Sequence, residues 1–138
     1  MPRQRMFTRL IPIIVLLLAA CSQSDSTQQD VRSLSSSAAT VETTLSAYLE
    51  RSIPQKFTQR ALQEGKNEQE KLLSDLEGST PQGSGTAARD VARSLIETTS
   101  RAQTAVARSD RKGARQALEE LKDPAQALRA LASPAAGQ

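Results

Sequence analysis

The sequence predicts an all-α fold, a small bundle of about two helical hairpins joined by a glycine-rich loop. Apolar residues recur at steps of three and four on both sides of that loop, which is the spacing of one helix face. Three glycines and a proline are concentrated between Gly78 and Gly85, which marks a break rather than an element. Further along the chain, Asp110 and Asp123 each precede a helical pattern and are suited to cap it.

Residues 1–20 have the pattern of a secretory signal. Three arginines precede an apolar run from Leu10 to Leu18, and two alanines follow it. The run is shorter than the roughly 20 apolar residues needed to span a bilayer. The four residues Leu18, Ala19, Ala20 and Cys21 resemble the lipobox of bacterial lipoproteins, and this resemblance covers residues 1–22 only.

The lipobox resemblance implies an address and an anchor. Signal peptidase would recognise Leu18, Ala19 and Ala20, and Cys21 would become the acylated first residue of the mature protein. Several acyl chains hold a protein on a membrane far more firmly than one chain does. Because Ser22 and not Asp follows the cysteine, the resemblance implies the outer membrane, with the protein facing the periplasm.

The basic character of the chain has a local origin. The sequence has 18 basic and 15 acidic residues, but three arginines and no acidic residue lie within residues 1–20. The remainder carries 15 residues of each sign and is neutral. We therefore expect no nucleic-acid partner, since binding to phosphate backbones depends on excess positive charge.

Residues 21–29 are polar and predict a flexible tether between the lipid and a helical domain over residues 30–134. Asp30 is a candidate N-cap for the first helix of that domain. Apolar residues then follow a heptad seam, at Val31, Leu34, Ala38, Val41, Leu45 and Tyr48.

The seam has two interpretations. It is either an amphipathic face packed on the rest of the domain, which we favour, or a short coiled coil. The second arrangement is similar to the major outer-membrane murein lipoprotein, although this chain ends in Gln138 where that family has a lysine. The candidate face for a partner or for self-association consists of Val31, Leu34, Val41, Leu45 and Tyr48.

Pro54 predicts the end of the first helix, because proline disfavours helical geometry in the residue before it. Residues 63–71 are almost entirely polar and are expected to form a solvated face. The loop at residues 78–86 divides the domain into halves, residues 30–77 and 87–134. In the second half we expect a turn at Ser109–Asp110 and a new helix starting at Asp123–Pro124, followed by a disordered tail at residues 135–138.

The second half also carries a basic stripe, for which a solvated helix face is the favoured interpretation and binding to phospholipid or an acidic partner is the alternative. The stripe consists of Arg89, Arg93, Arg101, Arg108, Arg111, Lys112 and Arg115.

The residue types argue against catalysis. There is no His, and Cys21 is the only Cys, so the commonest general base and Cys-based metal sites are both missing. We expect no catalytic residues, no metal and no cofactor.

The core is also thin, because only 19 Leu, Ile, Val and Phe residues lie in residues 21–138. We therefore expect a non-enzymatic, lipid-anchored periplasmic protein that binds a protein partner, as an accessory or assembly factor of an envelope system. The alternatives are a self-associating structural or stress-related envelope lipoprotein, and a binder of lipid or a small molecule.

Overall fold

The computed structural model describes residues 4–79 and 84–133, with side chains described over residues 26–78 and 86–133. Its four helices are α1 (Gln4–Leu49), α2 (Gln55–Ser79), α3 (Ser84–Ala107) and α4 (Arg111–Ala132). The predicted all-α bundle is confirmed. The predicted loop at residues 78–86 is too long, because α2 continues to Ser79 and α3 begins at Ser84. The predicted tail at residues 135–138 lies outside the described residues.

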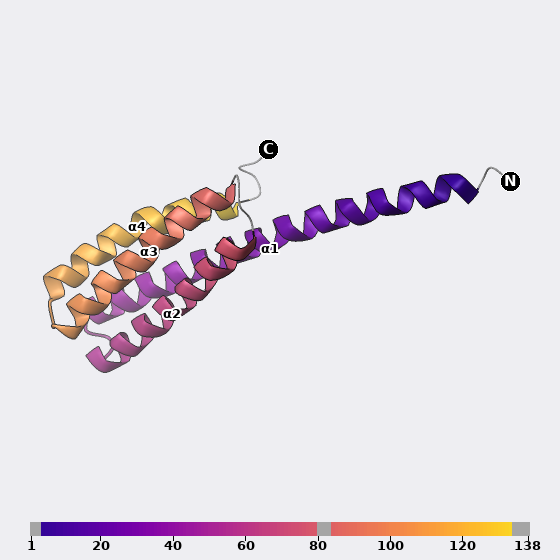
Figure 1. Cartoon of the computed structure of the whole chain (residues 1–138). Coiled ribbons are helices and arrows are strands. Elements are labelled where there is room, and N and C mark those ends of the chain that lie inside the picture. Colours follow the sequence, from indigo (N-terminus) through magenta and orange to yellow (C-terminus); the bar gives the residue numbers. More distant parts are fainter. Residues whose placement is uncertain (1–3, 80–83, 134–138) are drawn as a thin grey trace.

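The helices alternate in direction and form a ring. Each packs on its neighbours, α1 on α2, α2 on α3, α3 on α4, and α4 back on α1, while the diagonal pair α1 and α3 makes only a small contact. The α1–α2 and α3–α4 connections lie together at one end of the bundle (Figure 1). We call this the turn end and define it as residues 49–60 and 103–116. The first part of α1 extends beyond the other helices from the opposite end (Figure 1).

Residues 21–29, expected to form a flexible tether, instead continue α1, so Asp30 lies within a helix and is not its N-cap. The segment contains neither Gly nor Pro, and it is held at its end by the bundle. The Gln28 Nε2 donates hydrogen bonds to the carbonyls of Leu131 and Ala132, at 3.3 and 2.8 Å. These contacts satisfy carbonyls that the end of α4 would otherwise leave without an intrahelical donor.

The new helix expected at Asp123–Pro124 is a second correction, because α4 runs through Pro124 without interruption. A proline inside a helix removes one backbone hydrogen bond and costs about 3 kcal/mol or more. Here Pro124 is buried, as are Leu121, Ala125 and Leu128 on the same helix. Packing of this face against the bundle outweighs the local preference to stop.

The core runs the length of the bundle and combines leucines with many alanines. Its largest fully buried aliphatic side chains are Leu34, Leu45, Leu62, Leu76, Leu95, Leu121, Leu128, Val41 and Val106. The alanines lie mostly on α3 and α4, where small side chains let helix backbones approach closely. They include Ala88, Ala92, Ala102, Ala105, Ala114, Ala117 and Ala125.

The heptad seam of α1 is part of this core. Val31, Leu34, Val41, Leu45 and Tyr48 are all buried, the most exposed being Tyr48 at 5%. The chain's own helices α2 and α4 cover this face. The interpretation as an internal face therefore holds for the folded chain, and the five residues do not form a surface for a partner or for a second copy.

One position in the polar stretch at residues 63–71 is not solvated. Gln69 is fully buried, and its Nε2 donates a hydrogen bond to the Ser37 Oγ at 3.3 Å. Its Oε1 has no hydrogen-bond partner. Gly65, one turn earlier, passes close to α1, because a Cβ at this position would lie 3.0 Å from the Val41 Cγ2. Both residues lie on the inward face of α2, which also carries Thr58, Leu62 and Leu76.

Candidate functional site

The two helices that lead into the turn end, α1 and α3, end with the same backbone geometry. At the end of α1, the Ser52 N–H donates to the Ala47 carbonyl at 2.8 Å and the Arg51 N–H to the Tyr48 carbonyl at 3.0 Å. This is a Schellman motif, in which the residue after the cap adopts the left-handed conformation. Arg51 has a φ of 62°, and Ser109 has a φ of 55° in the matching motif at the end of α3. Neither position is the glycine that such a motif favours.

Side chains join the two connections. The Gln55 Nε2 donates to the Val106 carbonyl at 2.7 Å, and the Ser109 Oγ donates to the Gln55 Oε1 at 3.1 Å. Gln55, at the start of α2, therefore binds the end of α3 through both atoms of its amide. This places two turns that are distant in sequence in a fixed relation to each other.

Arg111 adds a second link across the turn end. Its guanidinium donates to the carbonyls of Tyr48 and Leu49, at 3.2 and 2.6 Å, and lies 5.2 Å from the centroid of the Tyr48 ring. A cation at the C-terminus of a helix is favoured by the helix dipole, and one over an aromatic ring by the ring quadrupole. The first residue of α4 thus holds the last turn of α1. A hollow of about 320 Å³ remains beside these contacts, lined by Tyr48, Arg51, Ile53, Gln55, Ser109 and Arg111.

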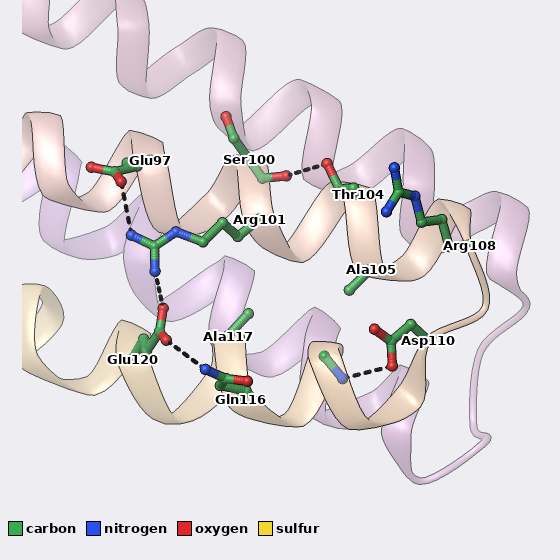
Figure 2. Close-up of a pocket in the computed structure, with 11 residues that line it drawn as sticks. Glu97, Ser100, Arg101, Thr104, Ala105, Arg108, Asp110, Gln116, Ala117 and Glu120 are labelled. Atoms are coloured by element: carbon green, nitrogen blue, oxygen red, sulfur yellow. Dashed lines mark hydrogen bonds and ion pairs between the residues drawn. The ribbon is translucent and has the colours of Figure 1, made fainter.

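A longer groove of about 450 Å³ leads from the turn end along the surface between α3 and α4 (Figure 2). Arg101 spans this groove, because its guanidinium pairs with Glu97 on its own helix and with Glu120 on α4. Nearer the turn, Asp110 Oδ1 accepts a hydrogen bond from the Gly113 N–H at 2.9 Å, which confirms Asp110 as the N-cap of α4. Arg108 also lines the groove (Figure 2).

The turn end is strongly basic. It contains seven basic residues and two acidic ones, Glu50 and Asp110, and the latter carboxylate caps α4. Six of the seven basic side chains have neither an ion pair nor a side-chain hydrogen bond in the described part of the chain. All six are exposed: Arg51, Lys56, Arg60, Arg108, Lys112 and Arg115. We call these six residues the basic cluster.

Outside the turn end the charges are matched differently. The rest of residues 21–138 has eight basic and 13 acidic residues. Five of those basic side chains form ion pairs, at N–O distances of up to 3.9 Å. They are Lys66, Arg93, Arg101, Lys122 and Arg129. The predicted basic stripe is thus divided, since Arg93 and Arg101 are paired whereas Arg108, Lys112 and Arg115 belong to the basic cluster.

Phe57 lies within the turn end, next to Lys56. Among the described residues it is the large hydrophobic side chain that is exposed, at 58%. Leu62, five residues further along α2, faces the core, whereas Phe57 does not. The sequence alone does not group Lys56, Phe57 and Arg60 with the cations of α4. That grouping follows from the fold, in which α2 and α4 begin at the same end of the bundle.

A smaller polar hollow of about 330 Å³ lies between α1 and α4, lined by Glu42, Lys122, Gln126 and Arg129. The Glu42 Oε2 is 3.9 Å from the Arg129 guanidinium, and its Oε1 is buried without a hydrogen-bond partner. The hollow therefore offers a ligand one long ion pair, and none of its lining residues belongs to the turn end.

The side chains of Leu18, Ala19, Ala20 and Cys21 lie outside the described set, although their backbone is helical within α1. In the described part of the chain, no helix combines the length and apolar content needed to cross a membrane. No three His, Cys, Asp or Glu side chains of that part are grouped closely enough to hold a metal ion. Comparison with protein-family models, curated proteins and solved structures found no significant match for this chain.

Proposed function

We propose that this protein is a non-enzymatic lipoprotein of the cell envelope, anchored by acyl chains on Cys21 and facing the periplasm, that binds a protein partner through its helical bundle. Such a role fits an accessory or assembly factor of an envelope system. The observation that carries the proposal is the arrangement along α1. Residues 18–21, which resemble a lipobox, lie within the part of α1 that extends beyond the other helices, and the turn end of the bundle lies at the C-terminal end of the same helix.

The helix gives the anchor a defined geometry. Cys21 and Val31 lie ten residues apart on α1, which corresponds to roughly 15 Å at the helical rise of 1.5 Å per residue. A helical connection of this kind holds the bundle away from the lipid, and it points the turn end away from the membrane.

The two alternatives are less well supported. Self-association through the α1 seam would require its buried residues to become exposed, at the cost of the bundle core. Binding of an apolar lipid or small molecule calls for a pocket lined predominantly by hydrophobic and aromatic side chains, whereas eight of the eleven residues that line the groove between α3 and α4 are charged or polar and none is aromatic.

The anchor is tested by metabolic labelling with a fatty acid, combined with the intact mass of the purified protein. The wild type and a Ser24→Ala control should incorporate label and lack the mass of residues 1–20. Cys21→Ser should incorporate none and retain that mass. Equal labelling of the Cys21→Ser variant would refute the anchor.

The partner is tested separately, by photocrosslinking in intact envelopes from positions spread over the exposed surface of the bundle. Reproducible crosslinks to one protein support the proposal. If no position crosslinks to a protein, the proposed binding role is rejected even where the anchor has been established.

A further inference from the structure

The basic cluster differs from the other cations of residues 21–138, because in the described part of the chain five of the eight basic side chains outside the turn end form ion pairs and none of the six in the cluster does. Six exposed cations from the two connections, α2 and α4 lie at one end of the bundle, and none has a carboxylate partner among the described residues. Like charges held together oppose the compact state, so the cluster lowers stability. Residues 21–138 contain 15 acidic residues, and 13 of them lie outside the turn end. A ligand that supplies negative charge would remove this repulsion.

The composition of the cluster indicates what kind of ligand fits. Four of its six members are arginines, whose planar guanidinium binds carboxylates through two parallel hydrogen bonds. Arginine and aromatic residues are also enriched at protein–protein interfaces and supply much of their binding energy. Phe57 provides the aromatic side chain, exposed in the same region as Lys56 and Arg60.

The turn end also has the concave shape and the fixed geometry of a binding surface. The hollow of about 320 Å³ beside Arg51 and Arg111, and the groove that Arg108 lines, are concave places into which side chains of a partner can insert. The links between Gln55, Ser109 and Arg111 hold this surface in a fixed geometry, which reduces the entropy lost on binding.

We propose that the turn end is the docking surface for an acidic protein segment, with the basic cluster binding Asp and Glu carboxylates and Phe57 contacting an apolar residue of that segment. The inference rests on the proposed function, because it names the partner chemistry and the surface for that binding role. An anionic membrane is the competing source of negative charge. Surfaces that lie on membranes present several large apolar side chains together with cations, whereas Phe57 stands alone among the described residues.

The test uses the full chain in detergent micelles and a fluorescent peptide of glutamates with one central leucine. We expect binding that weakens as salt is added, because the ion pairs are screened. The variant Arg60→Gln with Lys112→Gln should lose roughly tenfold in affinity. The control Arg32→Gln with Lys71→Gln makes the same change of charge and residue type at exposed positions outside the turn end, and it should bind as the wild type does.

Phe57 is tested with the same peptide and with one that lacks the leucine. Phe57→Ala should weaken binding of the first peptide and leave binding of the second unchanged, since the exposed ring adds apolar contact only where the partner provides it. An equal effect on both peptides would overturn the assignment of Phe57.

Three outcomes would overturn the docking surface: no binding of either peptide, equal loss of affinity in the control variant, or binding only to vesicles of phosphatidylglycerol and phosphatidylcholine. Photocrosslinking separates this inference from the proposed function. If a photoreactive residue at position 71 captures the envelope partner and one at position 57 does not, the binding role stands and the turn end is refuted as its surface.

Discussion

The turn end and the rest of the bundle are built from the same four helices but treat charge in opposite ways. Away from the turn end, Arg93 pairs with Glu77 at 3.0 Å and with Asp90 at 3.2 Å, while Arg101 joins α3 to α4. At the turn end, the six residues of the basic cluster face solvent without an ion-pair partner among the described residues, although the backbone and other side chains of this region are closely linked. The contrast separates two properties of a surface. A region can be rigidly built for the fold while its charge is left open for a ligand.

The largest test asks whether the two regions differ in folding as well as in charge. Leu62→Ala, nearer the turn end, and Leu76→Ala, farther from it, should each lower the unfolding free energy by about 2–5 kcal/mol, because both side chains are fully buried. Tyr48 contacts Arg111 of the turn end, and the chain has no Trp and no other Tyr, so Tyr fluorescence reports that end while circular dichroism reports all helices. Coincident urea transitions would show one cooperative unit. Separate transitions would show that the regions fold independently.

A smaller effect is expected from the left-handed residue of the first connection. Arg51→Gly should raise the unfolding free energy by roughly 1 kcal/mol, because glycine adopts this conformation without steric cost and one repelling charge is removed. Lys71→Gly, inside α2, should lower it by about 1 kcal/mol. Urea unfolding of both variants measures the difference. A loss of stability in Arg51→Gly would mean that the side chain contributes more than the backbone strain costs.

Charge itself should have opposite consequences in the two regions. The variant Arg60→Gln with Lys112→Gln should gain about 0.5 kcal/mol at low salt, through reduced repulsion. Arg93→Gln should lose a similar amount, about 0.5 kcal/mol, because it removes a cation from two exposed ion pairs. Both differences should shrink as salt is added. If the turn-end variant lost stability at low salt, its cations would be stabilising the fold and the comparison would fail.

The smallest effect concerns Asp30, in the region away from the turn end. Burial, and then the negative charge of Asp75, raises the pKa of Asp30 above its ordinary value of 3.8. The folded state therefore binds this proton more tightly than the unfolded state does. Its contribution to stability is present at pH values below 3.8 and is lost as the pH rises through the raised pKa.

Asp30→Asn should flatten this part of the pH profile and slightly raise stability at neutral pH. Asp75→Asn should flatten it less, because the charge of Asp75 is the second cause and not the first. Unfolding measured from acid to neutral pH checks both. An unchanged profile in Asp30→Asn would show that another group sets the acid behaviour.

Local chemistry in the sequence predicted much of the fold. Pro54 and the Ser109–Asp110 turn mark real helix boundaries, and Asp110 is the cap that its residue type suggests. The prediction of a new helix at Asp123–Pro124 was wrong, because burial of this face of α4 outweighs the local signal to end a helix. The polar tether was misjudged for a related reason, since a helix held by the bundle propagates through residues that would not begin one.

The candidate site depended more on topology than on composition. The inward face of α2 could have been traced by continuing steps of three and four from Leu62 to Leu76, which places Gly65 and Gln69 inside. No such rule places Arg60 at the same end of the bundle as the cations of α4, because that placement follows from the alternating directions of four helices. The basic stripe could be identified in the sequence, whereas its division into paired and unpaired residues required the structure.

The contact of α1 with α4 closes the ring between the first and last helices of the bundle. Hairpins and neighbouring helices are local contacts that form early and quickly. The apolar seam of α1, by contrast, remains partly uncovered until the final helix has been synthesised. The bundle can therefore close only after α4 has been synthesised. A polypeptide interrupted before Arg111 would expose that seam to chaperones and proteases, which distinguishes it from the finished protein.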